Sequence, residues 1–286
     1  MSYCAPNRKN GLSTEKSSCF TLAELIALCK AWNATKLGSK NPIHVKQEDT
    51  TKDESTIKLK LWQELKKRFY PYCKDNESCW LDNVELNSKL KKLYPAIYDS
   101  VHFFSLKPKG TKGKNDWLST LEIDYIMKQY ENMYTDFSFI GCLPSDYFIL
   151  NPERFPKKVL DTKAKAGIIF NLDETHQNGS HWVALFFEQV GTDLLVEYFD
   201  PTGQPPNKNI KQFLSNRYFN GALYIENKKE HQRGNNECGS YSLFFIICRL
   251  KGKTFDEIND GRIPDTDMNK LRSIIFRPFS EKWSAF

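Results

Sequence analysis

The chain of 286 residues lacks an apolar run of the roughly 18 residues that a membrane-spanning helix needs. No apolar core follows its polar start, so we expect no secretory signal peptide. Outside the pair Cys73 and Cys79, no close pair of cysteines or histidines completes a four-ligand zinc pattern. These absences argue against a membrane protein and a zinc protein, and we expect neither a metal nor another cofactor.

Eight cysteines would normally raise the question of disulfides. Without a signal peptide, a reducing intracellular compartment is the expected setting, where disulfides rarely persist. Cys73 and Cys79 are close enough in sequence to form a bridge or share a metal. Cys29 and Cys248 lie in apolar helical stretches, and we expect both to be inert packing residues.

The charge balance is mildly basic, with a net charge of +6. Such a charge suits an acidic partner, including nucleic acid, without requiring one. The densest basic run, residues 107–114, has no interleaved aromatic residues, which weakens a nucleic-acid-binding interpretation. We therefore expect this run to be a solvated linker, and nucleic acid stays a possible partner.

The first part of the chain is predicted to be helical. Thr21 and Glu24 form a capping box ahead of a helix that reaches about Trp32. An apolar stripe at every fourth position predicts a helix over 55–69, ended by Tyr70-Pro71. Residues 79–98 are predicted to be helical too, and residues 33–54 a loop. The glycine and lysine run that follows suggests an N-terminal helical arm domain at 1–110 and a core at 111–286.

The second part of the chain mixes helices with short apolar runs. A capping box at Ser119 and Glu122 predicts a helix to about Tyr134. The runs predict strands at 167–170, 182–187, 194–199 and 222–226, with the middle two as an antiparallel hairpin. Helices are predicted at 208–217, 238–250 and 265–275, the last with Met268, Leu271, Ile274 and Ile275 facing inward. The expected class is α+β: a central sheet, a buried helix starting at Cys238 and flanking helices.

Cys238 begins that apolar helix. A thiol in the first turn of a helix faces unsatisfied backbone N–H groups and the positive end of the helix dipole. Both favour the thiolate, which is the nucleophilic form of cysteine. Gly239 would allow the backbone to turn tightly and a substrate carbonyl to approach closely. The arrangement predicts a cysteine hydrolase.

A general base is predicted at His181, one of five histidines. It precedes a buried strand, and Asp200 ends the next one. Antiparallel pairing would place both at the same end of the sheet, where a carboxylate can orient an imidazole. Asp200 also precedes Pro-x-Gly, which is typical of a turn, so both roles stay open.

Two further residues have two interpretations each. Gln232 can be a solvated loop residue, or its side-chain amide can be the second oxyanion donor beside the Cys238 N–H. Trp182 is core in most such positions, but beside the base it can form the wall of a narrow substrate cleft.

His181-Trp182, Asp200, Gln232 and Cys238-Gly239, in this order and spacing, resemble the clan of SUMO-specific and adenovirus-type proteases. The similarity is strongest to the polyprotein-processing cysteine proteases of African swine fever virus and related large DNA viruses, over roughly residues 115–277. Proteins of that type carry asparagine where this chain has Asp200.

The resemblance implies a papain-like core in which His181 is the base, Asp200 orients it and Cys238 is the nucleophile. Gln232 and the Cys238 N–H would form the oxyanion hole, and Trp182 would flank a cleft selective for Gly-Gly. It further implies cleavage of viral structural polyproteins during virion maturation, in host cytoplasmic viral factories and the virion.

Two alternatives remain at this stage: removal of ubiquitin-like modifiers such as SUMO, and a non-catalytic binding module on a protease-like core. For the N-terminal helical part, a packing role and a substrate-recruiting role are both open.

Overall fold

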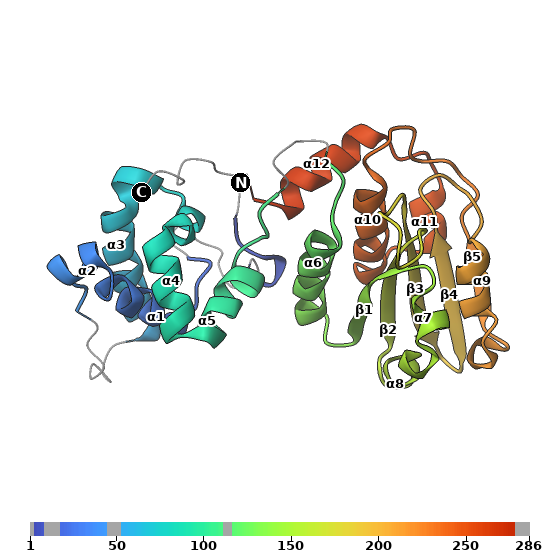
Figure 1. Ribbon diagram of the computed structural model, residues 1–286, viewed down its shortest axis with the longest axis horizontal. Helices are drawn as coiled ribbons and strands as arrows, with labels where there is room; N and C mark the ends of the chain where they lie inside the picture. Colours follow the sequence, from blue (N-terminus) through green and yellow to red (C-terminus); the bar gives the residue numbers. More distant parts are fainter. Residues whose placement is uncertain (1–2, 9–17, 45–52, 111–115, 278–286) are drawn as a thin grey trace. The chain divides into compact units, whose positions relative to one another are not determined.

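The computed structural model describes residues 3–8, 18–44, 53–110 and 116–277, which form two compact units (Figure 1). The helical unit comprises residues 1–109 and 276–286, and the sheet unit residues 110–275. Arg277 belongs to the helical unit, where its N–H donates to the Pro108 carbonyl at 2.9 Å and its guanidinium to the Ser78 carbonyl at 3.1 Å. In the described residues, no helix combines the length and apolar character that crossing a membrane requires.

Short helices around an apolar core make up the helical unit. Its elements are η1 (Pro6–Arg8), α1 (Leu22–Asn33), α2 (Lys36–Lys40), α3 (Glu54–Cys73), η2 (Glu77–Asp82), α4 (Val84–Leu93), α5 (Pro95–Ser100) and η3 (Val101–Ser105). The capping box at Thr21 and Glu24 starts α1 as predicted. Leu28, Phe69 and Trp80 are among the buried residues that hold α1, α3 and η2 together.

Three boundaries in this unit differ from those predicted. Pro71 lies inside α3, because a proline in the last turn removes only one hydrogen bond and the helix ends soon afterwards. The helix predicted at 79–98 is three pieces, since Asn83 caps a new helix and Pro95 begins another. Part of the loop predicted at 33–54 is the helix α2, capped by Thr35; residues 45–52 lie outside the described part.

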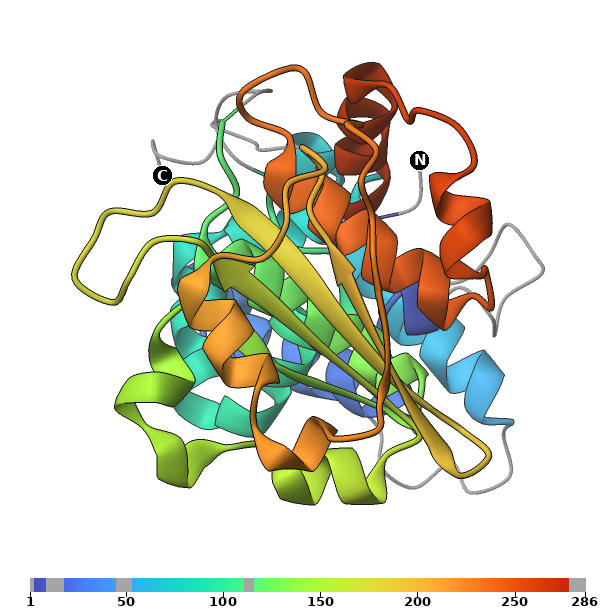
Figure 2. The same ribbon diagram turned by 90° about the vertical axis from the view of Figure 1, so that its right-hand side faces the viewer.

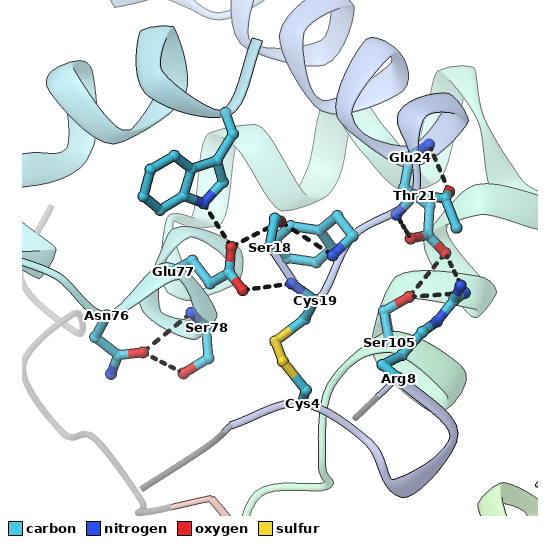
Figure 3. Close-up of a disulfide and its surroundings, with 12 residues drawn as sticks. Cys4, Arg8, Ser18, Cys19, Thr21, Glu24, Asn76, Glu77, Ser78 and Ser105 are labelled. Carbon is cyan, nitrogen blue, oxygen red and sulfur yellow. Dashed lines mark hydrogen bonds and ion pairs between the residues drawn. A yellow bond between two sulfur atoms is a disulfide. The ribbon is translucent and has the colours of Figure 1, made fainter. Parts of the chain in front are cut away.

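The expectation that the cysteines are reduced is wrong for Cys4 and Cys19, and of the two options for Cys73 and Cys79 the bridge is the one that forms. Cys4 is bonded to Cys19, and Cys73 to Cys79. Glu77 lies beside the first bridge, where its carboxylate accepts from the Cys19 N–H at 2.7 Å (Figure 3). Both sulfurs of this bridge belong, with Glu77, to a possible metal-ligand group, but they are bonded to each other. Cys29 is free and buried, and burial raises its thiol pKa to about 12, as befits inert packing.

The basic run at 107–114 is not a solvated linker over its described part. Lys107 is buried, and its N–H donates to the Tyr3 carbonyl at 2.9 Å. Lys109 forms an ion pair with Asp82 at 2.5 Å. Residues 111–115 lie outside the described residues.

A twisted five-stranded sheet forms the centre of the sheet unit, with strand order β1-β2-β3-β4-β5 (Figure 2). The strands are β1 (Phe137–Pro144), β2 (Lys165–Asn171), β3 (Trp182–Val190), β4 (Asp193–Phe199) and β5 (Leu223–Glu226). The outer pairs are parallel and the inner pairs antiparallel, so the sheet is mixed. The helices are α6 (Thr120–Met133), α7 (Tyr147–Leu150), η4 (Pro152–Arg154), α8 (Lys157–Thr162), α9 (Lys208–Leu214), η5 (Arg217–Phe219), α10 (Cys238–Leu250), α11 (Phe255–Asn259) and α12 (Asp265–Ile275).

Both faces of this sheet are apolar, because successive strand residues point to opposite sides and each side is covered. On one side Phe170 and Leu185 pack with Phe148 and Phe213 from α7 and α9. On the other, Phe199 stacks on Phe245 of α10 with ring centroids 4.8 Å apart. The predicted α+β class, the hairpin and the buried helix from Cys238 are confirmed.

Two features of the sheet unit were not predicted correctly. Strand β1 was missed, since its Gly141 interrupts the apolar alternation and the pairing register shifts between Phe139 and Gly141. In α12, Ile274 was expected to face inward but is 55% exposed, while Arg272 is buried with Met268 and Ile275. An arginine therefore occupies the inner face of that helix.

Candidate active site

His181 and Asp200 meet at one end of the β3–β4 hairpin. Ala184 pairs with Phe199, so the residue before β3 and the residue after β4 lie at the same edge of the sheet. The Nε2 atom of His181 is 2.9 Å from Oδ1 of Asp200. The structure thus brings the two residues together, as antiparallel pairing predicts.

Asp200 also organises the turn that follows it. Its Oδ1 accepts from both the N–H and the hydroxyl of Thr202 at 2.7 Å, and its carbonyl accepts from Gly203, whose φ is +72°. The side chain of Asn227 holds the main chain of Asp200 from the other side, with contacts of 2.8 and 2.6 Å. The two interpretations of Asp200 are therefore compatible: the turn fixes the carboxylate that contacts His181.

The charge state of His181 follows from its neighbours. Burial alone lowers the pKa of the imidazole, but hydrogen bonds and charges from Asp200 and Cys238 outweigh it and raise the pKa to about 9. Because Nε2 faces Asp200, Nδ1 is the nitrogen left to contact the Cys238 side chain. The ring is thus protonated at neutral pH and lies between a carboxylate and a thiol.

Cys238 is the first residue of α10, and its side chain is buried, with the residue 1% exposed. The N–H groups of a first helical turn have no intrahelical acceptor, so they point to whatever binds there. Gly239 has helical backbone, so the tight-turn interpretation is wrong. A Cβ at Gly239 would come within 3.1 Å of Leu118 and 3.2 Å of Trp182, so a larger residue there would force its neighbours to shift slightly.

Trp182 is part of that packing. Trp182 is 6% exposed, and its indole N–H donates to the Leu118 carbonyl at 3.0 Å. The ring touches the first turn of α10 beside the thiol. These contacts fit the core interpretation, and a role as a cleft wall stays a prediction.

Gln232 is buried rather than solvated, with 5% exposure. Its Nε2 donates to the Gly234 carbonyl at 2.9 Å, which uses one of the two amide hydrogens. The main-chain N–H groups of His231 and Gln232 both donate to the Pro201 carbonyl at 2.8 Å. This loop is therefore tied to the turn that carries Asp200.

The other histidines have different surroundings. The buried His231 accepts from the Ile263 N–H through Nδ1 at 3.2 Å, so its Nε2 donates to Asn259 at 3.0 Å. Burial lowers its pKa, and the ring is a neutral structural group. His176 and His44 are exposed, and His102 lies in the helical unit.

Sequence reasoning missed Arg272, whose guanidinium reaches the start of α10. Its Nε donates to the Ser240 hydroxyl at 3.0 Å and its Nη2 to the Asn236 carbonyl at 2.9 Å. The signal was present in the spacing, because a position four after Met268 and three before Ile275 lies on the buried face.

A cavity of about 340 Å³ lies away from these residues, between α9 and the edge strand β5. Pro206, Leu214, Phe219 and Tyr224 are among its lining residues. None of the predicted site residues lines it, so the chemistry indicated by His181 and Cys238 is not located there.

Comparisons with known proteins agree with this geometry. The profile described as the Ulp1 protease family, C-terminal catalytic domain, matches residues 118–284. The mimivirus protein R355, which carries a thiol-protease name and comes from Acanthamoeba polyphaga mimivirus, is 31% identical over 97% of this chain and 94% of its own. The SUMO-1 cysteine protease S273R of African swine fever virus (isolate Tick/South Africa/Pretoriuskop Pr4/1996) is 34% identical over 39% of this chain and 43% of its own.

The fold has a solved counterpart. The crystal structure of the African swine fever virus pS273R protease matches with a TM-score of 0.66 at 21% identity, covering 97% of this chain and 96% of that one. The likeness extends over both units of the chain, including the helical N-terminal part that the family profile does not reach.

Proposed function

The chain belongs to the Ulp1 protease family and is a cysteine protease, and on this premise we propose that it is an endopeptidase that cuts viral structural polyproteins after Gly-Gly. The proposal places this cleavage in virion maturation, in the host cytoplasm and the virion. The observation that carries it is the line of contacts from Asp200 through His181 to Cys238. The binding-module alternative does not account for a chain of this enzyme class.

The first half of the proposed reaction forms a thioester. His181, protonated in the resting site, holds the proton that Cys238 has given up, and the thiolate of Cys238 adds to the scissile carbonyl carbon. The oxyanion accepts from the Cys238 N–H and from the second amide hydrogen of Gln232. As the intermediate collapses, the imidazolium gives its proton to the leaving amine and the C–N bond breaks.

The second half releases the acid product. His181, neutral after protonating the amine, removes a proton from water, which attacks the thioester. The C–S bond then breaks, which releases the acid and restores the thiolate of Cys238 beside the imidazolium of His181. Asp200 holds the imidazole in the required orientation throughout and stabilises its positive charge. The carboxylate does this more strongly than the asparagine of the resembling proteases, because it carries a full charge.

The burial of the site supports the Gly-Gly preference. Cys238 is 1% exposed, and Trp182 and Leu118 pack against the adjacent Gly239. A peptide whose last two residues lack side chains has the smallest cross-section for reaching such a thiol. Each added Cβ would have to displace buried groups, which costs free energy in a close-packed surrounding.

The same proposal includes the domain organisation: residues 1–110 form a helical arm domain and residues 111–286 form the catalytic core. Its support is that the family profile begins at residue 118 and that the candidate site lies within the sheet unit. We propose that the arm domain recruits the polyprotein rather than taking part in the chemistry.

The test compares peptides that differ by one methyl group. Gly-Gly-Xaa, Ala-Gly-Xaa and Gly-Ala-Xaa peptides of equal length are incubated with the full chain and with Cys238→Ser, and products are identified by mass. We expect cleavage after Gly-Gly alone, and none by the variant. Equal cleavage of all three peptides would contradict the proposal. Parallel reactions with duplex DNA test whether nucleic acid alters the rate.

A SUMO-specific deconjugase is the second candidate, favoured by the name of one relative, SUMO-1 cysteine protease. An electrophilic probe built on the C-terminus of SUMO or ubiquitin distinguishes the two. Labelling of Cys238 by this probe faster than by a Gly-Gly peptide carrying the same electrophile would favour deconjugation. Equal or slower labelling favours the polyprotein protease.

A further inference from the structure

Arg272 is a buried cation near the candidate nucleophile, and the reaction above gives it no role. It lies on α12, 34 positions after Cys238 in the numbering, and is 7% exposed. Burying a guanidinium is expensive unless hydrogen bonds and opposite charges surround it. Its contacts therefore indicate why an arginine is placed there.

Two hydrogen bonds of Arg272 flank Cys238 symmetrically. Nη2 donates to the carbonyl of Asn236, two residues before the thiol, and Nε donates to the hydroxyl of Ser240, two residues after it. The fork of a guanidinium is planar, so both bonds together define the position of the segment between them. The first turn of α10 is thus held from α12.

The charge of Arg272 faces the same segment. Burial lowers its pKa, while the charges of Glu237, Glu122, Cys238 and Asp116 act in the opposite direction. An arginine stays protonated under all these influences. A fixed positive charge beside a thiol favours the thiolate over the neutral form, in the same direction as the helix terminus.

We propose that Arg272 is a positioning residue for Cys238: it fixes the first turn of α10 and favours the thiolate. The inference rests on the proposed role of Cys238 as nucleophile. The guanidinium holds the oxyanion-binding N–H of Cys238 in place through Asn236 and Ser240, and its positive charge, like that of the His181 imidazolium, favours the thiolate.

Three variants separate this role from packing. Arg272→Gln removes the charge, and Arg272→Lys keeps the charge but loses the fork. Arg249→Lys is the matched control: Arg249 is equally buried in α10, at the other end of the helix, where it binds Glu197 and Glu188 at 2.6 Å each. Thermal unfolding of each variant reports stability alone.

The decisive readout is the pH dependence of iodoacetamide alkylation at Cys238, followed by mass spectrometry of its peptide, together with kcat and KM for a Gly-Gly peptide. For Arg272→Gln we expect the alkylation midpoint to rise by about one pH unit, with kcat about tenfold lower and KM unchanged. For Arg272→Lys we expect a wild-type midpoint with kcat about threefold lower. Arg249→Lys should change only the unfolding temperature.

Two outcomes overturn the inference. One is a wild-type alkylation midpoint and kcat in Arg272→Gln; the other, which decides if that variant does not fold, is a wild-type kcat in Arg272→Lys. Failure of the proposed function looks different, because the unmodified chain itself would then cleave no Gly-Gly peptide.

Discussion

The two units of the chain use cysteine differently. In the helical unit four cysteines are joined as Cys4–Cys19 and Cys73–Cys79, and only Cys29 is free. In the sheet unit the three cysteines are free and buried, namely Cys142, Cys238 and Cys248. Short helices bury limited apolar area and gain from covalent closure, whereas a sheet covered on both faces is stable without it. The difference leaves the thiol chemistry to the sheet unit.

Histidine shows the same contrast. In the helical unit, burial and the charges of Arg277 and Lys109 lower the pKa of His102 to about 4, so the ring is neutral. In the sheet unit, His181 is also partly buried, yet Asp200 and Cys238 raise its pKa to about 9. Partial burial beside two cations therefore neutralises one histidine, and partial burial beside a carboxylate and a thiol keeps the other charged.

The largest expected effect is the loss of activity when the reactive cysteine of the sheet unit is replaced, compared with replacement of an inert one. Cys238→Ser should lower kcat/KM on a Gly-Gly peptide by at least about 10⁴-fold, because the serine hydroxyl is not ionised beside the imidazole. Cys248→Ser is the matched control at the far end of the same helix, where burial raises the thiol pKa. It should keep wild-type kcat. Full activity of Cys238→Ser would show that another residue is the nucleophile.

The second effect sharpens the contrast between the histidines. Removing the charge of Asp200 should lower the pKa of His181 from about 9, since the Asp200 hydrogen bond and charge help to raise it. The alkaline limb of the pH–rate profile should then shift to lower pH, and kcat/KM should fall about a hundredfold. The measurement is the profile of Asp200→Asn, whose side-chain oxygen can still accept from Thr202 and so preserves the turn.

Asp200→Ala is the companion variant, because it also removes the turn contacts. If it lowers only the unfolding temperature and leaves the rate unchanged, Asp200 is a turn former and nothing more. If both variants lose activity to the same degree while Asp200→Asn remains as stable as the wild type, the loss belongs to the charge.

Much of the difference between the two units could be predicted from the sequence, at the positions where neighbouring residues determine the local structure. The order of His181, Asp200 and Cys238, the hairpin between the first two and the buried helix of the third all follow from apolar periodicity and turn residues. The helix spacing could have placed Arg272 on the buried face of α12, but its contacts with Ser240 and Asn236 belong to a distant segment and no local pattern predicts them. The bridge between Cys4 and Cys19 was missed since pairing depends on tertiary contact rather than on composition.

The third prediction concerns the Cys4–Cys19 disulfide of the helical unit. Replacing Cys4 and Cys19 by serine opens a loop with a sequence separation of 15 residues, which should destabilise the helical unit by about 3 kcal/mol. Hydrogen exchange of peptides from α1 and η3 measures it. Cleavage of a short Gly-Gly peptide by the same variant should stay at the wild-type rate. A large loss of peptide cleavage would show that the helical unit takes part in the chemistry.

A related experiment can show in which compartment the Cys4–Cys19 bridge forms. Disulfides are rare in a reducing cytoplasm, and the proposed site of action includes that compartment. Thiol trapping on material from infected cytoplasm and from virions would show where Cys4 and Cys19 are bonded. If the bridge is present only in virions, the helical unit reaches its full stability only after the protein has passed from the cytoplasm into the virion.

The smallest effect concerns the neutral histidine of the helical unit. The pKa of folded His102 is about 4 and that of the unfolded residue about 6.5, so its contribution to stability is complete above pH 6.5 and is lost as the pH falls toward 4. At pH 5.5 the loss should be about 1 kcal/mol. His181 has the opposite sign: its raised pKa stabilises the fold below pH 6.5, and this contribution is lost as the pH rises through about 9. Urea unfolding of His102→Asn between pH 7.5 and 5.5 isolates the first effect, because asparagine does not titrate. If His102→Asn loses as much unfolding free energy between pH 7.5 and 5.5 as the wild type, other groups cause the acid sensitivity. The expected difference between His102 and His181 would then be wrong.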